Sequence, residues 1–278
     1  MKVIALIENK AKGHLKSEHG LAVYIEYNDK KYLLDTGKTN KFSENAVELG
    51  IDLNEIDVGI LSHSHYDHSG GYNVFFSKNQ KAKVYIRKEA KELCYSKLGP
   101  LKRYVGIPKG ILNKYSDRFI YIDKDYKIDE GVWLISHKYN NLESKGKKAH
   151  MYRMSKYGLK PDDFKHEQSL VFETKEGLVI LNSCSHIGID NIVKEVKKTF
   201  KDKKVLAVIG GFHLMGIIGP SSMGPTKEEV EFLGKSLTSL GIEHVYTCHC
   251  TGTPAYKVLK NTLGNKVEYF STGTVIEF

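Results

Sequence analysis

The stretch His-Ser-His-Tyr-Asp-His-Ser-Gly-Gly, residues 63–71, decides the fold prediction for this chain. His63, His65, Asp67 and His68 place three imidazoles and one carboxylate within six residues. Neutral imidazole is the commonest side-chain ligand for zinc and similar ions, and a carboxylate adds charge and a harder donor. In a tight loop, His63 and His65 can point one way while Asp67 and His68 point another. The loop can therefore supply half of each of two adjacent metal sites.

The flanks of this stretch favour a functional site at a strand end. The apolar run at 58–61 is typical of a short buried strand, and the Ser-Gly-Gly at 69–71 indicates a turn into a helix. The His-rich loop therefore follows the carboxyl end of a strand, where ligands and catalytic groups gather in α/β sheets.

The second half of the chain repeats this arrangement. Apolar strands predicted at 178–182, 205–209 and 244–247 each run into a loop that carries a histidine, namely His186, His213 and His249. Because such loops meet at one edge in an α/β sandwich, their recurrence is stronger evidence for a shared site than any single histidine.

Periodicity and turn signals predict the remaining elements. We expect further strands at 2–7, 21–27, 31–35, 83–86, 119–122, 132–135, 169–173, 267–270 and 274–277. We expect helices near 41–49, 72–76 and 88–94, after residue 188, and after the two N-cap residues Thr226 and Thr253. The segments 94–118 and 137–168 show little periodicity and are predicted to be irregular inserts.

The basic charge of the chain lies in these two segments. Residues 94–118 carry six basic residues and one acid, and residues 137–160 carry seven and one, so together they exceed the net charge of +9. We expect lid-like inserts whose cations hold an anionic substrate and whose tyrosines stack on a ring. The candidates are Lys102, Arg103, Lys147, Arg153, Tyr104 and Tyr152. For any single lysine, a solvated charged surface is the alternative.

Composition argues against several classes of protein. The basic residues are 38 Lys and 4 Arg, whereas nucleic-acid binders favour Arg, and they cluster in short loops rather than a long stripe. No run approaches transmembrane length, the first apolar run is too short for a signal peptide, and the four cysteines form no disulfide framework. We expect a cytoplasmic protein that acts on a small anionic molecule, without a membrane partner.

The His-rich motif resembles the signature of the metallo-β-lactamase-fold superfamily. Four further motifs are similar to its dihydropteroate-synthase-related branch, which is associated with methanopterin-type pterin biosynthesis: HEQSL (166–170), NSCSHIG (182–188), GGFHL (210–214) and HCTG (249–252). The resemblance implies an α/β fold, a four-layer αββα sandwich of two pseudo-repeated halves, formed by residues 1–278 as a single domain.

The resemblance also implies the metal ligands. His63, His65 and His186 would bind one divalent ion, and Asp67, His68 and His249 a second. Zinc is the first expectation for the metal, with manganese and iron as alternatives.

Four other residues have open roles. Cys184 stands where many members of the superfamily place a bridging aspartate, so it is either a bridging thiolate or a small buried residue. His213 is either a ligand or a substrate contact, and His166 is a further possible ligand. Asp35 either orients a ligand histidine or caps its own turn.

We expect a metal-dependent hydrolase of a small anionic substrate, for which a phosphorylated aromatic molecule is a candidate. Asp67 and His213 are the expected catalytic residues, and Asp67 would orient the nucleophile. The alternative is a metal-dependent transferase of pterin biosynthesis. An RNA-processing nuclease ranks lower.

Overall fold

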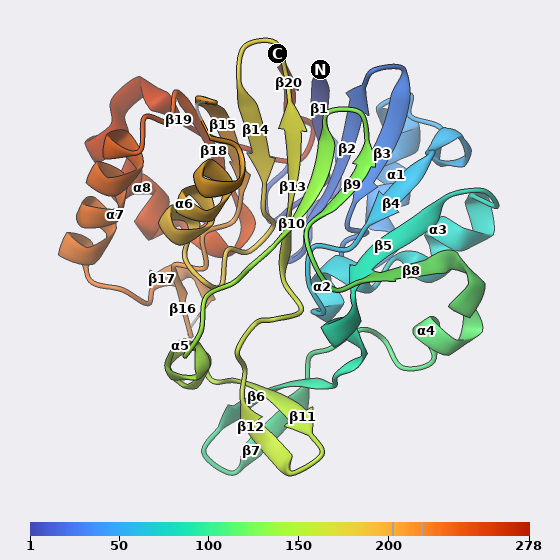
Figure 1. The fold of residues 1–278 in the computed structure, drawn as a ribbon, viewed down its shortest axis with the longest axis horizontal. Helices are drawn as coiled ribbons and strands as arrows, with labels where there is room; N and C mark the ends of the chain where they lie inside the picture. Colours follow the sequence, from blue (N-terminus) through green and yellow to red (C-terminus); the bar gives the residue numbers. More distant parts are fainter. Residues whose placement is uncertain (202, 218) are drawn as a thin grey trace. The chain divides into compact units, whose positions relative to one another are not determined.

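The computed structural model describes residues 1–201, 203–217 and 219–278, and it contains two compact units. The first unit comprises Met1–Lys124, Lys138–Gln168 and Ser271–Glu277; the second comprises Asp125–His137, Ser169–Phe270 and Phe278. Each unit has a seven-stranded sheet, a smaller sheet and helices of its own (Figure 1). The predicted α/β class is therefore confirmed.

The large sheet of the first unit positions the His-rich loop. Its strands, in spatial order, are β20 (Val275–Glu277), β1 (Lys2–Ile7), β2 (Ala22–Tyr27), β3 (Lys30–Leu34), β4 (Val58–Ile60), β5 (Lys83–Arg87) and β8 (Phe119–Ile122). The pairs from β3 through β8 are parallel. The carboxyl ends of β3 and β4 therefore lie side by side, which brings Asp35 next to the loop that begins at Leu61.

Helices of the first unit bury an apolar face against this sheet. The core cluster joins Phe42 and Ala46 of α1 (Lys41–Glu48) and Phe75 of α3 (Tyr72–Lys78) to sheet residues. Full burial of a side chain such as Phe75 contributes about 1.5–3 kcal/mol. The remaining helical segments of the unit are α2 (Tyr66–Ser69), α4 (Ile111–Lys114), α5 (Glu143–Lys148), η1 (Leu53–Glu55), η2 (Lys88–Lys91) and η3 (Ser116–Arg118).

A buried amide ties this core together. The Asn79 side chain is fully buried and donates to the carbonyls of Leu53, Asn54 and Ile56, at 2.8–3.2 Å. Its oxygen accepts the backbone N–H groups of Lys81 and Ala82. Because unpaired buried carbonyls and N–H groups are costly, this one side chain stabilises the turn between α3 and β5.

The prediction that 94–118 and 137–168 are irregular was wrong. These segments form a second, four-stranded sheet in the first unit, in the order β12 (Gly158–Pro161), β11 (Met151–Ser155), β6 (Cys94–Leu98) and β7 (Leu101–Tyr104) (Figure 1). The expected helix at 88–94 is only the short η2, and residue 94 already belongs to β6.

The strands of this small sheet lack the apolar alternation that marks a half-buried strand. Contacts between aromatic side chains join the strands instead. The ring centroids of Tyr95 and Tyr104 are 5.5 Å apart. The Lys102 ammonium also lies 3.9 Å from the centroid of the Tyr95 ring. Both contacts join neighbouring strands of one hairpin.

The large sheet of the second unit repeats the plan of the first. Its order is β19 (Val267–Tyr269), β18 (His244–Thr247), β15 (Val205–Gly210), β14 (Leu178–Leu181), β13 (Gln168–Glu173), β10 (Val132–Ser136) and β9 (Tyr126–Asp129). The pairs from β14 through β19 are parallel. The loops that follow β14, β15 and β18 therefore emerge at one edge of this sheet.

The helices of the second unit are α6 (Ile189–Thr199), α7 (Lys227–Ser239) and α8 (Thr253–Leu263), with η4 (His249–Thr251) and η5 (Gly264–Lys266). The capping box of Thr226 and Glu229 at α7 is confirmed, whereas the N-cap of α8 is Gly252 rather than Thr253. A two-stranded sheet joins β16 (Met215–Gly216) to β17 (Gly219–Met223). No helix among the described residues is long and apolar enough to span a bilayer.

Candidate metal centre

Asp35 fixes the orientation of His68 in the first unit. Its buried carboxylate lies 2.7 Å from His68 Nδ1 and accepts the backbone N–H and the hydroxyl of Ser62, each at 2.7 Å. Because a carboxylate only accepts, the proton of a neutral His68 lies on Nδ1 and its Nε2 lone pair remains available for a metal. Asp35 therefore orients the ring of His68, and metal binding by His68 stays a prediction.

The same hydroxyl sets the tautomer of His63. Ser62 Oγ gives its proton to Asp35, so it accepts from His63 Nδ1, which lies 2.8 Å away. His63 therefore also presents Nε2 as a lone-pair donor. The ring centroids of His63 and His68 are 4.2 Å apart, and those of His63 and His65 are 4.6 Å apart. The loop thus gathers the rings of His65 and His68 around the ring of His63.

The segment that begins β13 holds the other side of the loop. Gln168 donates its backbone N–H to Ser62 O at 2.9 Å and its amide N–H to Leu61 O at 2.8 Å. His166 Nδ1 accepts the backbone N–H of Ser64 at 3.2 Å, and its Nε2 lies 3.1 Å from Asp162. The backbone between the predicted ligands is therefore fixed from two directions, by Asp35 and by this segment.

His166 also belongs to a buried group of possible ligands. Its members offer ligand atoms within 4.8 Å of one another: His65, Cys94, Asp162 and His166. Both ring nitrogens of His166 already take part in hydrogen bonds, with the backbone N–H of Ser64 and with the carboxylate of Asp162. In this structure the ring of His166 therefore positions the loop.

Asp67 contacts a histidine that the sequence analysis did not identify. His19 Nε2 lies 3.3 Å from Asp67 Oδ2, and the backbone N–H of Leu21 donates to Asp67 O at 3.2 Å. A Cβ at Gly20 would lie 2.6 Å from that same oxygen, so glycine permits the close approach. No strand-end motif flags His19, because it precedes β2.

In the second unit, each of the three predicted histidines follows one of three parallel strands. His186 follows β14, His213 follows β15 and His249 opens η4 after β18. The His186 and His213 rings have centroids 4.5 Å apart. His213 and His249 have φ values of +49° and +51°, a left-handed conformation that costs a non-glycine residue about 1 kcal/mol or more. Such strain is typical of functional loops.

Two cysteines meet beside His249. The sulfurs of Cys184 and Cys250 are 3.3 Å apart, and with His249 they offer ligand atoms within 4.8 Å of one another. Burial alone would raise the pKa of the Cys250 thiol, but hydrogen bonds with Cys184 and His213 and the charges of His249 and His213 hold it well below its usual value. Neither sulfur is part of a disulfide.

Arg103 is the predicted substrate cation that lies against the His-rich loop. Its guanidinium carbon is 5.3 Å from the ring centroid of Tyr66, the residue before Asp67. The backbone N–H of Tyr66 donates to Val105 O at 3.0 Å, which fastens the end of β7 to the loop. The exposed side chain of Arg103 can therefore approach a ligand held at this loop.

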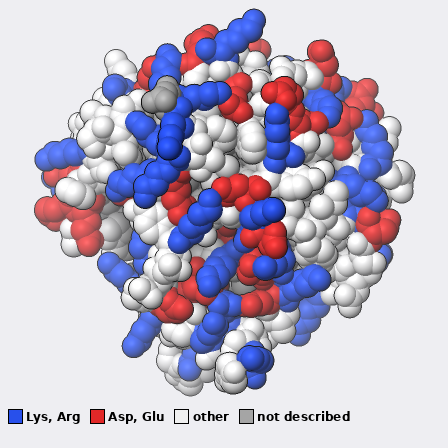
Figure 2. Space-filling model, in the orientation of Figure 1, with Lys and Arg blue, Asp and Glu red and all other residues white. Residues whose placement is uncertain are grey.

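The other predicted substrate residues have different surroundings. Arg153 is 7% exposed and forms ion pairs with Glu92 and Asp163, so its charge is neutralised within the protein. Tyr104 donates its hydroxyl to Ile107 O, and burial raises its pKa to about 12. Tyr152 is half-buried on β11 and Lys147 is exposed on α5. Figure 2 shows basic and acidic side chains interspersed on the face that it draws.

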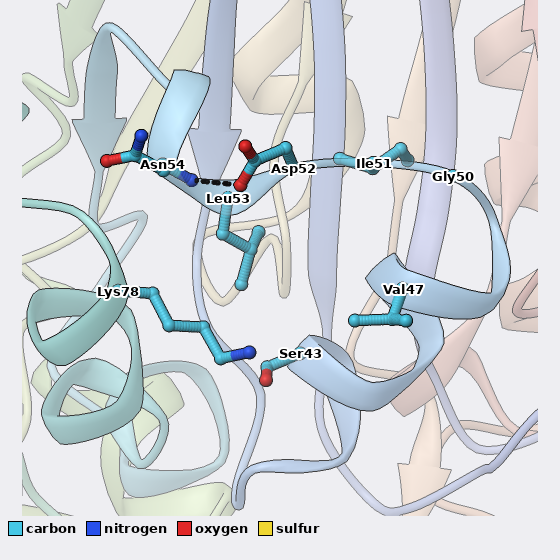
Figure 3. Close-up of a pocket in the computed structure, with 8 residues that line it drawn as sticks. All are labelled: Ser43, Val47, Gly50, Ile51, Asp52, Leu53, Asn54 and Lys78. Atoms are coloured by element: carbon cyan, nitrogen blue, oxygen red, sulfur yellow. Dashed lines mark hydrogen bonds between the residues drawn. The ribbon is translucent and has the colours of Figure 1, made fainter.

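A hollow between α1, η1 and α3 contains none of the predicted site residues. It has a volume of about 460 Å³ and is lined by Ser43, Val47, Gly50, Ile51, Asp52, Leu53, Asn54 and Lys78 (Figure 3). Its acid, Asp52, caps η1 by accepting the Asn54 N–H at 2.9 Å. The hollow offers no imidazole or thiol, and we assign it no role.

Comparisons with known proteins identify the family of the chain. The model of the metallo-beta-lactamase superfamily matches residues 17–143. A curated relative, 7,8-dihydropterin-6-methyl-4-(beta-D-ribofuranosyl)-aminobenzene-5'-phosphate synthase of Methanocaldococcus jannaschii, is 28% identical over 278 residues, covering 94% of this chain and 90% of that protein.

Two solved structures are similar over the whole chain. Tm1679, described as a metal-dependent hydrolase of the beta-lactamase superfamily, is 32% identical with a TM-score of 0.82, covering 100% of this chain and 99% of that one. The metallo-beta-lactamase fold protein YhfI from Bacillus subtilis is 13% identical with a TM-score of 0.57, covering 99% of each chain, and shows the fold alone. The matched family model and the similarity to Tm1679 show that the chain belongs to the metallo-β-lactamase superfamily.

Proposed function

We propose that this protein is a metal-dependent hydrolase of a small anionic substrate, with a phosphorylated aromatic molecule as the first candidate. The observation that carries the proposal is the orientation of the loop imidazoles. Hydrogen bonds of their Nδ1 atoms with Asp35 and Ser62 leave His68 Nε2 and His63 Nε2 as lone-pair donors. Buried hydrogen bonds that orient the ligand side chains are typical of metal sites.

The donor set fits divalent ions. Imidazole nitrogens and one carboxylate suit zinc, manganese or iron, and the four residues that would offer them are buried, namely His63, His65, Asp67 and His68. We propose the ligand pairing that the superfamily motif implies: His63, His65 and His186 at one ion, and Asp67, His68 and His249 at the other. Such ions would polarise the bond that breaks and acidify the attacking water.

The chain's own groups would do the rest of the chemistry. Asp67 would orient the attacking water through its carboxylate, which His19 Nε2 holds in place at 3.3 Å. His213 would contact the substrate from the loop after β15. The exposed guanidinium of Arg103 would bind the substrate's anionic group, and Tyr66 offers a ring face beside it.

A transferase is the second candidate, and one finding favours it. The curated relative that covers 94% of this chain is named as a synthase that forms a pterin linked to a ribofuranosyl-aminobenzene phosphate. An aromatic, phosphorylated substrate suits the same arginine and tyrosine. In this reading a second substrate, instead of water, would attack the group that is transferred, and the metals would stabilise the leaving group as its bond to that group breaks.

The two candidates differ in the fate of solvent oxygen. The zinc- or manganese-loaded protein would be incubated with aryl phosphate mono- and diesters in ¹⁸O-labelled water. A hydrolase incorporates one labelled oxygen into the product, whereas a transferase turns over only with an acceptor and incorporates none. His65→Ala should abolish turnover and leave the circular dichroism spectrum unchanged. Wild-type turnover in this variant would contradict both candidates.

A further inference from the structure

The edge of the second unit's large sheet gathers sulfur as well as imidazole. Cys184 lies in the loop after β14, and His249 and Cys250 lie in η4 after β18. The three side chains are at most 4% exposed. They offer one ligand atom each within 4.8 Å of one another. Two thiols and an imidazole form the Cys₂His set that zinc uses in some catalytic sites.

The sulfur–sulfur distance excludes a disulfide bond and is compatible with ligation of a shared ion. A disulfide requires about 2.05 Å, which is well short of the 3.3 Å between Cys184 Sγ and Cys250 Sγ. Two sulfurs at 2.3 Å from a tetrahedral zinc ion are about 3.8 Å apart. The observed pair is thus within about half an ångström of the spacing that a shared zinc ion imposes.

The neighbouring backbone is shaped around the Cys250 sulfur. The backbone N–H of His213 donates to Cys250 Sγ at 3.3 Å, which holds this sulfur in place. A Cβ at Gly211 would lie 2.6 Å from this sulfur, so only glycine leaves room for it at that position. The Cys250 sulfur can therefore occupy this position because residue 211 is a glycine.

Cys94 and Cys248 provide the contrast. Both are fully buried, like the pair, and Cys248 is adjacent to His249 in sequence. Neither belongs to the group formed by Cys184, His249 and Cys250. A general tendency of cysteine to be buried does not account for the contact between Cys184 and Cys250.

We infer that Cys184 and Cys250 ligate, as thiolates, the metal ion that His249 binds, and that this ion is therefore thiophilic. The inference rests on the proposed function in taking His249 as a ligand. It deepens that function by selecting zinc or another soft ion over manganese, because thiolates favour such metals.

Cobalt(II) is the probe, because thiolate ligation gives it a near-ultraviolet charge-transfer band. The metal-free protein, residues 1–278, would be loaded with cobalt, and the bound metal would be counted by elemental analysis. Cys184→Ala and Cys250→Ala should weaken or abolish the band, whereas the matched controls Cys94→Ala and Cys248→Ala should retain it. Circular dichroism would verify the fold of each variant.

Each outcome separates this inference from the function on which it rests. An unchanged band in both Cys184→Ala and Cys250→Ala, or loss of the band only in Cys94→Ala, would overturn the thiolate ligation. If His249→Ala still loses cobalt in that case, the proposed metal enzyme survives without sulfur ligands. Full cobalt content in His249→Ala would contradict both.

A second measurement covers variants that fail to fold. The wild-type protein would be alkylated with iodoacetamide with and without zinc, and each cysteine peptide quantified by mass spectrometry. Zinc should protect Cys184 and Cys250 more strongly than Cys94 or Cys248. Equal protection of all four cysteines would overturn the inference.

Discussion

Asp35→Asn tests whether the oriented imidazoles are the basis of metal binding. Asp35 has φ +62°, a left-handed conformation that Asn tolerates as readily as Asp, so the substitution adds no backbone strain. It replaces one carboxylate oxygen with an N–H₂ group. In one orientation of the Asn amide, its N–H₂ group faces the backbone N–H of Ser62. In the other orientation it faces the N–H of His68 Nδ1, so a hydrogen bond is lost in either case.

The expected cost follows from those contacts. Loss of one hydrogen bond to a buried charged group lowers the free energy of unfolding by about 1.5–3 kcal/mol. The His68 ring is no longer held in the tautomer that presents Nε2, and loss of such a partner weakens metal affinity by about 10- to 100-fold. That range corresponds to about 1.4–2.8 kcal/mol of binding free energy.

The assay is zinc competition against a chromophoric chelator, with thermal unfolding measured in parallel. Asp52→Asn is the matched control, since Asp52 caps η1 and Asn is an equally good cap. It should leave the zinc dissociation constant unchanged. A folded Asp35→Asn variant with the wild-type zinc dissociation constant would show that metal binding does not depend on the orientation of His68 by Asp35.

Three further predictions follow from particular contacts. Arg103→Ala should raise the KM for an anionic substrate by about 10- to 100-fold, because a charged hydrogen bond to the substrate is lost. Lys102→Ala should raise the KM less, because the ammonium of Lys102 lies over the ring of Tyr95. Equal effects of the two substitutions in steady-state assays would argue against a role of Arg103 in substrate binding. Asn79→Ala should lower the free energy of unfolding in urea by at least about 2 kcal/mol, because it strands several buried backbone groups; a change below about 0.5 kcal/mol would be a failure. Burial alone would raise the pKa of Glu173, but Lys203 and the Trp133 N–H hold it below its usual value. The stability advantage of the wild type over Glu173→Gln should therefore be present above about pH 4.5 and disappear as the pH falls further; an advantage that persists at pH 2 would contradict this.

The sequence predicted the strands and the His-rich loop because their signals are local. The apolar run before residue 63 and the ligand spacing after it are contained in one short stretch. The sequence also indicated that Asp35 either orients a ligand histidine or caps its own turn, because this aspartate follows a strand with a clear apolar pattern.

The supporting contacts could not be predicted, because they join distant parts of the chain. Gln168 reaches Leu61 across 107 positions, and Cys250 reaches Cys184 across 66. No local pattern encodes such pairs. The small sheet of β6, β7, β11 and β12 was missed for a different reason, since its strands have mostly polar side chains and no apolar alternation.

The binuclear centre is tested most directly by the metal content of the purified protein and of three variants: His68→Ala, His249→Ala and the double variant. We predict about two ions per chain in the wild type and about one in each single variant. Because His68 and His249 are proposed to hold the same ion, the double variant should also retain about one. A double variant that binds none, or a wild type with a single ion that neither substitution removes, would contradict the binuclear centre.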